Sequence, residues 1–513
     1  MNVLLVHPGF PEPFIGSCRV FVGRKVSSHI PLGLVTVASL FPSDWHLWLR
    51  DLVFEDISDQ DWNEADLVGI TGMCVQDRQI IEIIKEAKKR GKTVLAGGGW
   101  ASHFPEDVLN LGADLVVEGE AEPIFDEVLE RLRSREFGAV ITPAEKTHME
   151  LAPPPRFDIL NLKKYLSMSV QFSRGCPFKC EFCDVTNLMG RKVRTKSPGQ
   201  VLNELQALYD LGWRNRVLFT DDNFIGIPPR AKTLLKSLIP WMDSRDRPFE
   251  FFTQLSANVS SDDELLDLLA GAGFWQVCVG IESTDPETLK RTGKLHNVSL
   301  DLDKVCRKIH EAGITMIATF MIGYDNEKPG VDQRVIDFVT RNHIPEVYLH
   351  PLRATPGTEL WKRLEREGRL LPEANLSIAH TPALMNFVPT RPKAEIAREA
   401  VHVYDAMYEP IGFLKRALDL LSVMEPTNAP KSSTELPPGA VQWLMISLYR
   451  QGVVYPSRWK FWRLFFSTLV KFPGRFRLFL FYCTFGVIAF EFMRDVISAV
   501  NVEMERTEGE STS

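Results

Sequence analysis

The stretch Phe172-Ser-Arg-Gly-Cys176-Pro-Phe-Lys-Cys180-Glu-Phe-Cys183-Asp184 contains three cysteines in a Cys-x3-Cys-x2-Cys pattern. Three thiolates at this spacing can bind three irons of a cubic iron-sulfur cluster and leave the fourth iron open for a non-protein ligand. A structural zinc site would normally need a second Cys-x2-Cys pair, and the sequence contains none. We therefore interpret Cys176, Cys180 and Cys183 as the metal ligands of a 4Fe-4S cluster at a site of chemistry.

The remaining cysteines are scattered singly among apolar residues, at Cys18, Cys74, Cys278, Cys306 and Cys483. A free cysteine in such surroundings usually packs as a small buried hydrophobe, so we expect these five in the core. Reduced thiols next to an oxygen-sensitive cluster indicate the cytosol.

The glycine before Cys176 and the aromatic Phe182 before Cys183 make this stretch resemble the signature of the radical SAM superfamily. The resemblance implies that the open iron chelates the amino and carboxylate groups of S-adenosylmethionine, with Phe182 among the residues that bind it. An electron, from a donor such as flavodoxin or ferredoxin, would then break a carbon-sulfur bond. The resulting 5′-deoxyadenosyl radical takes hydrogen from carbons that no acid-base pair could deprotonate.

The overall composition is that of an ordinary globular protein. The chain has 513 residues, 45% of them apolar and 24% charged, which allows two to four domains. A net charge of −7 spread along the sequence argues against a nucleic-acid partner, because phosphate binding needs a basic surface. The start, Met1–His7, lacks the features of a secretory signal and predicts a first β-strand.

Residues 1–141 alternate short apolar runs with amphipathic helical stretches, which predicts a Rossmann-like domain with a parallel sheet. The predicted strands are 3–6, 45–51, 67–71, 93–96 and 115–117, and the predicted helices are 32–40 and 80–90. Loops that follow such strands meet at the carboxyl edge of the sheet, where open α/β sheets bind ligands. These loops contain Thr71 and Gly72, Gly97 to Gly99, and Glu118 to Glu120.

Glycines after a strand also serve plain tight turns into a helix, so alone they are weak evidence for a ligand. Together, however, Pro31-Leu-Gly-Leu34, Gly97-Gly-Gly99 and Val116-Val-Glu-Gly-Glu120 resemble the cobalamin-binding domain that precedes many radical SAM domains. That resemblance implies cobalamin contacts from Thr71, Gly72, Gly97, Gly98, Gly99, Glu118, Gly119 and Glu120. The Asp-x-His-x-x-Gly motif, which supplies a histidine to cobalt in other cobalamin enzymes, is absent. His103 follows the glycine loop, and we interpret it as a capping or surface residue.

A proline-rich connector, residues 142–165, separates this domain from a second one at 166–380. The second domain again alternates strands with helices, which predicts the partial (β/α)6 barrel of the radical SAM superfamily. Its predicted strands are 167–172, 217–220, 251–254, 277–281, 314–322 and 346–350, and its predicted helices include 198–211, 262–272 and 302–312.

Polar residues follow several of these strands, where barrels carry their catalytic groups. Helix capping explains some of them, and we accept it for Ser260 and Asp262. Carboxylates and amides at strand ends can also hold the ammonium and ribose hydroxyls of S-adenosylmethionine by charge-assisted hydrogen bonds. By position, the resemblance implies S-adenosylmethionine contacts from Asp221, Asp222, Asn223, Ser256, Glu282 and Gly323.

Residues 381–505 predict a helical C-terminal module, followed by a polar, disordered tail at 506–513. Helices are predicted at 394–408, 414–423 and 441–450. The aromatic runs 459–466 and 478–490 are interleaved with arginine and lysine, which suits a helix at a membrane interface. A buried helical hairpin on the barrel explains them equally well. The second run has 13 residues, short of the roughly 20 needed to span a bilayer.

Over nearly the whole chain, this arrangement resembles the hopanoid C-2 methylase group and its relatives, through Pro177–Thr186, Arg194-Thr-Lys196 and Asp221–Gly226. The resemblance implies a cobalamin-dependent methyltransferase that acts on an inert carbon of a hydrophobic small molecule, either a hopanoid-like lipid or a tetrapyrrole. Such an enzyme would be cytoplasmic, with peripheral contact at the inner face of the membrane as an open option. An oxidative cyclase or rearranging enzyme of the same superfamily remains an alternative. A non-catalytic cobalamin or cluster sensor is a further one.

Overall fold

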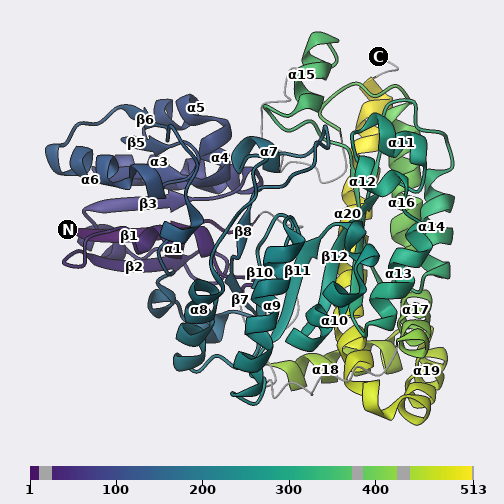
Figure 1. Cartoon of the computed structure of the whole chain (residues 1–513). Coiled ribbons are helices and arrows are strands. Elements are labelled where there is room, and N and C mark those ends of the chain that lie inside the picture. The colour runs from purple at the N-terminus through teal and green to yellow at the C-terminus, as the bar shows by residue number, and fades with distance from the viewer. Residues whose placement is uncertain (11–25, 372–384, 425–438, 511–513) are drawn as a thin grey trace.

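The computed structural model describes residues 1–10, 26–371, 385–424 and 439–510, and it is shown in Figure 1. Cys18 and the predicted domain boundary at 380/381 lie outside these residues. The N-terminal sheet has six parallel strands in the order β2-β1-β3-β4-β5-β6. They are β1 (Asn2–His7), β2 (His46–Asp51), β3 (Leu67–Thr71), β4 (Thr93–Gly97), β5 (Leu115–Val117) and β6 (Ala139–Ile141).

Helices cover both faces of this sheet, as the alternating sequence predicts. Leu5 packs in one hydrophobic core and its neighbour Leu4 in another, because successive side chains of a strand point to opposite faces. The Rossmann-like prediction is confirmed, although the last strand, β6, was not predicted. The helices are α1 (Leu32–Ala38), α2 (Asp59–Glu64), α3 (Asp77–Lys89), α4 (Gly98–His103), α5 (Pro105–Asn110) and α6 (Phe125–Ser134).

The second domain is a partial barrel of six parallel strands in the order β14-β13-β12-β11-β10-β7. The strands are β7 (Met168–Val170), β10 (Arg216–Phe219), β11 (Glu250–Leu255), β12 (Phe274–Glu282), β13 (Thr315–Ile322) and β14 (Glu346–Pro351). The outer helices are α8 (Pro198–Asp210), α9 (Pro228–Asp243), α10 (Asp263–Ala272), α11 (Pro286–Arg291), α12 (Leu295–Val298), α13 (Leu302–Glu311), α14 (Val331–Arg341) and α15 (Glu359–Arg366).

A small antiparallel pair, β8 (Ser173–Arg174) with β9 (Arg194–Thr195), brackets the cysteine stretch and short helix α7 (Val185–Leu188). Each strand has only two residues, too few for a sequence pattern to reveal. The connector consists of short 3-10 turns, consistent with its prolines, and it is tied to the first domain. The hydroxyl of Tyr165 donates to Asp51 Oδ2 at 3.0 Å.

The C-terminal module is helical, as predicted, and packs beside the barrel (Figure 1). Its elements are α16 (Lys393–Tyr408), α17 (Pro410–Val423), α18 (Ala440–Tyr449), the π-helical turn η8 (Arg450–Val454), α19 (Arg458–Lys471), the 3-10 turn η9 (Pro473–Arg475) and α20 (Phe476–Glu510). Cys306 and Cys483 are buried as expected, whereas Cys74 and Cys278 are only partly buried.

Helix α20 extends further than predicted, and its apolar segment is longer than predicted. Residues 506–510, expected in a disordered tail, continue the helix, because each added residue contributes one more backbone hydrogen bond. The apolar segment Pro473–Val502 has 30 residues and a mean hydropathy of 1.6, so by length and composition it matches a membrane span. Nevertheless Tyr482 and Cys483 are fully buried, and α20 packs along α16 and α17. The 478–490 run is therefore a packed core helix here.

Candidate active site between two domains

The three cysteines lie on the loop that follows β7, at the carboxyl end of the barrel. All three thiols are partly exposed, and burial raises the pKa of Cys180 to about 11 and that of Cys183 to about 12. No group of three or more Cys, His, Asp or Glu side chains in the described part of the chain converges tightly enough to hold a single metal ion. A cubic cluster does not require convergence, because each cysteine binds a different iron. Three cysteines on one loop are a donor set that suits such a cluster.

Asp221 and Asp222 hold the start of the cysteine loop. Asp221 Oδ2 accepts from the Phe172 amide at 3.1 Å, and its Oδ1 accepts from the amide and hydroxyl of Ser173. Asp222 Oδ2 accepts from the Gly175 amide at 3.0 Å. Burial raises the pKa of Asp221 to about 7, against the lowering effect of these hydrogen bonds. Both carboxylates therefore position the cluster loop, and their predicted contact with S-adenosylmethionine stays a prediction.

Asn223 and Ser256 form a second pair at adjacent strand ends. Asn223 Nδ2 donates to Ser256 Oγ at 3.1 Å, and the Ser256 amide donates to Asn223 Oδ1 at 3.2 Å. Asn223 also forms a side-chain hydrogen bond with the Cys176 thiol. The structure therefore places Asn223 beside the first cysteine, with Ser256 hydrogen-bonded to it. The predicted contact of both residues with S-adenosylmethionine stays a prediction.

Glu282 ends β12 with a left-handed φ of 65°, next to a register irregularity in its pairing with β13. Its Oε1 lies 2.8 Å from Nζ of Lys294, and both side chains are about nine-tenths buried. Burial alone would lower the pKa of Lys294, but the charges of Glu282 and Cys180 outweigh it and raise that pKa. A buried cation thus faces the cysteine loop, where it would offset part of the negative charge of a thiolate-bound cluster.

Gly323 directly follows β13, the neighbour of β12, and Phe182 lies close to the next residue, Tyr324. Gly323 has a φ of 96°, and a Cβ there would come within 2.7 Å of Met385 Cε from the C-terminal module. The Phe182 ring lies 6.0 Å from that of Tyr324. The left-handed backbone therefore favours glycine at position 323, whereas the flexible end of Met385 could move aside for a Cβ.

The glycine loops of the N-terminal domain also come together, at the carboxyl edge of its sheet. Gly98 has a φ of 85°, and a Cβ there would clash with Thr71 Oγ1 and lie 3.1 Å from the Gly72 amide nitrogen. Ser102 Oγ donates to the Gly98 carbonyl at 2.8 Å and accepts from the Gly119 amide at 2.8 Å. Ser102 therefore joins two loops that were predicted separately.

Glu120 has a different environment from the other predicted cobalamin contacts. Its buried carboxylate receives Arg194 at 2.8 and 3.0 Å and Arg174 at 3.2 Å, and both arginines flank the cysteine loop. The Thr147 amide adds a hydrogen bond of 2.7 Å. With both oxygens engaged, Glu120 links the first domain to the barrel.

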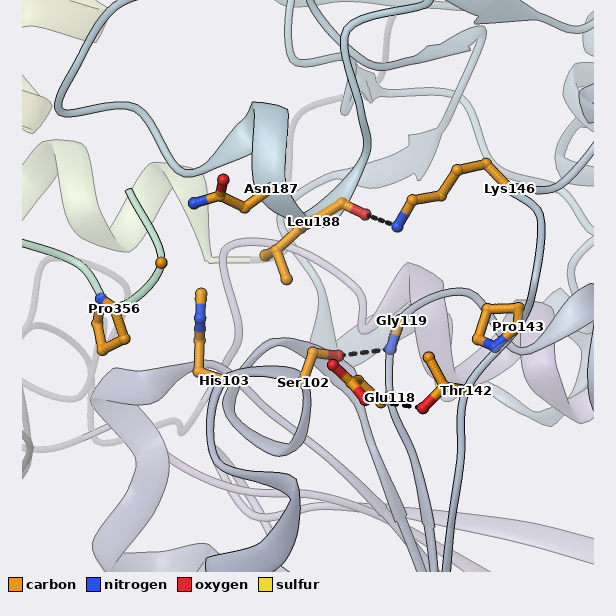
Figure 2. A pocket seen from close by; sticks show the side chains of 11 residues that line it. Ser102, His103, Glu118, Gly119, Thr142, Pro143, Lys146, Asn187, Leu188 and Pro356 are labelled. Carbon is orange, nitrogen blue, oxygen red and sulfur yellow. Dashed lines mark hydrogen bonds between the residues drawn. The ribbon is translucent and has the colours of Figure 1, made fainter. Parts of the chain in front are cut away.

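A cavity of about 250 Å³ lies where the two domains meet, and Figure 2 shows the residues around it. Ser102, His103, Glu118 and Gly119 come from the first domain, and Lys146 comes from the connector. The remaining lining residues are Thr142, Pro143, Asn187, Leu188, Pro356 and Gly357. Of the predicted cobalamin contacts, Glu118 and Gly119 line this cavity, and the segment after the cysteines faces them with Asn187 and Leu188.

His103 is the most informative residue that sequence reasoning set aside. Its side chain is only 7% exposed, and its Nε2 lies 2.8 Å from Oδ2 of Asp184, the residue after Cys183. Sequence reasoning also missed Lys294 and the arginines at Glu120, because ion pairs between distant segments leave no local pattern. Lys294 stands in a polar stretch, Arg291-Thr-Gly-Lys294, twelve residues after the end of β12, so no signal in the sequence pointed to it.

Comparison with known proteins agrees with this division. Residues 19–129 match the B12 binding domain family, residues 170–338 the radical SAM superfamily, and residues 358–501 a domain of unknown function (DUF4070). An uncharacterized methyltransferase of Synechocystis sp. is 42% identical over 94% of this chain and 90% of its own length. The hopanoid C-2 methylase of Rhodopseudomonas palustris is 32% identical over 67% of this chain and 66% of its own.

Among solved structures, the methyltransferase TsrM of Kitasatospora setae, with cobalamin and a [4Fe-4S] cluster bound, shares the fold. Its TM-score is 0.61, at 18% identity, over 95% of this chain and 99% of that one.

Proposed function

The chain belongs to the B12-binding radical SAM methyltransferases, and from this premise we propose that it methylates an unactivated carbon of a hydrophobic small molecule. The family uses a 4Fe-4S cluster, S-adenosylmethionine and cobalamin. When bound, these groups supply hydrogen abstraction from carbon and the methyl group itself. The likeness to a hopanoid C-2 methylase supports a polycyclic lipid as the first substrate class to test.

One observation carries the proposal: the cysteine loop and the edge of the cobalamin-binding sheet are in direct contact. His103 from the first domain reaches Asp184 at 2.8 Å, one residue beyond the last cluster ligand. Radical formation and methyl donation have to occur at the same substrate carbon. A shared wall between the two cofactor regions is what such a reaction needs.

The chain's own residues then have separable tasks. Asp221, Asp222 and Asn223 fix the cluster loop, and Lys294 with Glu282 places a buried ion pair beside it. To Ser256 and Glu282, two polar residues at strand ends, we assign contact with S-adenosylmethionine. The glycine loops at Gly98 and Gly119 leave the backbone open to a large cofactor.

The test is anaerobic reconstitution with iron, sulfide and hydroxocobalamin, followed by reduction and addition of S-adenosylmethionine with candidate substrates. Mass spectrometry would follow 5′-deoxyadenosine, S-adenosylhomocysteine and methylated product. Cys180→Ala removes a cluster ligand, whereas Cys306→Ala, in the buried face of α13, is the matched control. We expect both nucleosides and a methylated lipid from wild type and Cys306→Ala, and none from Cys180→Ala.

Other outcomes would redirect the proposal. Deoxyadenosine without S-adenosylhomocysteine, across lipid and tetrapyrrole substrates, would indicate a cyclase or a rearranging enzyme. Methylation of a tetrapyrrole alone would keep the reaction and replace the substrate class. The reductant supplied in the cell would be a small electron-transfer protein, which the same assay can compare with dithionite.

A further inference from the structure

The outer face of α19 is apolar and uncovered. Trp459, Arg463, Phe466 and Val470 follow one another at helical spacing on one side of this helix. Trp459 is 76% exposed and Val470 is 80% exposed, values that are unusual for large hydrophobic side chains. The opposite side of α19 is anchored, since Phe461 and Thr468 are fully buried.

Helix α18 shows the same organisation. Val441, Met445 and Tyr449 lie four residues apart and are each more than 60% exposed. The turn η8 joins the two helices and exposes Val453 and Val454 as well. In Figure 1, α18 and α19 lie at the same end of the molecule, away from the N-terminal domain.

The charge of this region is opposite to that of the whole protein. Between residues 439 and 490 the sequence contains seven basic residues and no acidic one, although the chain as a whole carries −7. Three of the seven have partners within the protein: Arg450 pairs with Glu491, the exposed Arg477 with Glu250 at 3.7 Å, and Arg475 donates to the Leu421 carbonyl.

The other four, Arg458, Lys460, Arg463 and Lys471, are exposed on α19. Within the described residues, none of these four has a carboxylate at ion-pair distance.

We infer that the exposed face of α18 and α19 docks this enzyme onto an anionic lipid bilayer. A helix that presents tryptophan, phenylalanine and valine among arginine and lysine matches a surface with an apolar interior and negative headgroups. Helix α20 does not span that bilayer in this arrangement, because it is packed against α16 and α17. Docking is peripheral and independent of which carbon the enzyme methylates.

Vesicle sedimentation of the full-length protein tests this directly. The probes are vesicles of phosphatidylcholine alone and of phosphatidylcholine with phosphatidylglycerol, at low and at high salt. We expect the wild type to sediment with the anionic vesicles at low salt only, because screening weakens the attraction of surface charges. Each basic residue near an anionic surface contributes about fivefold to partitioning.

Two pairs of variants separate this surface from general charge and hydrophobicity. Lys460→Glu with Arg463→Glu is compared with Arg133→Glu and Lys304→Glu, which make the same change in net charge on exposed positions of α6 and α13. We expect the α19 pair to lose partitioning by more than about tenfold and the control pair by less than about twofold.

The apolar contribution needs its own comparison. Trp459→Ser with Val470→Ser is set against Leu151→Ser with Phe137→Ser, which are exposed apolar residues of other segments. All variants would first be checked for an unchanged thermal unfolding curve and for cleavage of S-adenosylmethionine in solution.

Three results would overturn the inference. One is absence of wild-type sedimentation with anionic vesicles. The second is failure of the charge and position tests: wild type binds neutral and anionic vesicles equally, or the α19 variants and their controls lose vesicle binding equally. The third is a dimer in light scattering that Trp459→Ser dissociates, because the face would then be covered by a second copy of the chain.

Discussion

Nε2 of His103 lies 2.8 Å from Oδ2 of Asp184, and this contact joins the last turn of α4 to the residue after the third cluster cysteine. Sequence reasoning assigned His103 to a cap or to the surface, whereas the structure buries it at the wall of the interdomain cavity. The contact therefore fixes how the two cofactor regions face each other.

Replacing His103 should separate methyl transfer from radical formation. In His103→Ala we expect methylated product to fall by about 10- to 100-fold, since a displacement of about 1 Å has this effect on positioned reactants. Cluster absorbance and deoxyadenosine formation should stay near wild type. The assay measures both nucleosides and the product in one reaction, with the exposed His46→Ala as control. Equal loss of deoxyadenosine and product would contradict the positioning role.

Removing Glu120 should destabilise the interface between the two domains. Glu120→Ala leaves the buried guanidinium group of Arg194 without a carboxylate partner, whereas Arg174 keeps its pair with Glu122 at 2.7 Å. Removing one partner of a buried ion pair costs about 3–5 kcal/mol. The midpoint of the first transition in urea reports this loss. Glu127→Ala breaks only the exposed pair with Arg131 and should change stability by less than about 1 kcal/mol. Similar shifts of the urea midpoint in both variants would contradict the larger contribution of the buried ion pair to stability.

A methyl group at Gly175 should displace the cluster loop. Its φ is 94°, and an added Cβ would lie 2.8 Å from the Gly190 carbonyl oxygen and 3.0 Å from that of Lys192. Gly190 has a similar φ of 82°, but a Cβ there meets nothing within 4 Å.

Gly175→Ala and Gly190→Ala therefore share a backbone strain of about 1–2 kcal/mol, and only the first adds a clash. We expect Gly175→Ala to retain less iron after reconstitution than Gly190→Ala, measured as iron and sulfide per chain. Equal iron contents would contradict the steric argument.

Glu346 should make stability depend on pH. Burial raises its pKa from 4.5 to about 7, although Gln276 donates a hydrogen bond to it and Arg216 is nearby. Between pH 4.5 and 7 the folded protein keeps this proton while the unfolded chain loses it. The free energy of unfolding therefore decreases as the pH rises through this window.

Glu346→Gln removes this titration, so its stability should decrease less with pH than that of wild type, by up to about 3 kcal/mol. Urea unfolding at several pH values between 4.5 and 7 measures the difference. The exposed Glu130→Gln serves as control and should follow the wild-type curve. Parallel curves for wild type and Glu346→Gln would contradict the buried, protonated state.

Much of the fold follows from the sequence because it rests on local patterns. Strands such as Leu67–Thr71 and Leu115–Val117 are short, mostly apolar and bounded by turn residues, and they were predicted with their observed limits. The cysteine spacing likewise identified the Cys176–Cys183 loop as the candidate cluster site. Strand limits and cysteine spacing depend on residues that are neighbours in the chain, so they can be predicted from one sequence.

The site was less predictable because its contacts join distant segments. The oxygens of Asp221 accept from Phe172 and Ser173, nearly 50 positions away, and the sequence did not predict this positioning role. The pairing of Lys294 with Glu282 and of His103 with Asp184 required the folded chain. The sequence shows that polar residues follow the strands, but it does not show which residue each of them contacts.

The link between Glu120 and its two arginines also limits how such enzymes can be recombined. A chimera that joins the first domain of one relative to the barrel of another has to inherit Glu120, Arg174 and Arg194 from a single parent. A crossover in the proline-rich connector, which looks like a natural seam in the sequence, would separate the carboxylate from both guanidinium groups. Libraries that exchange substrate specificity should therefore keep this triad intact and vary the C-terminal module instead.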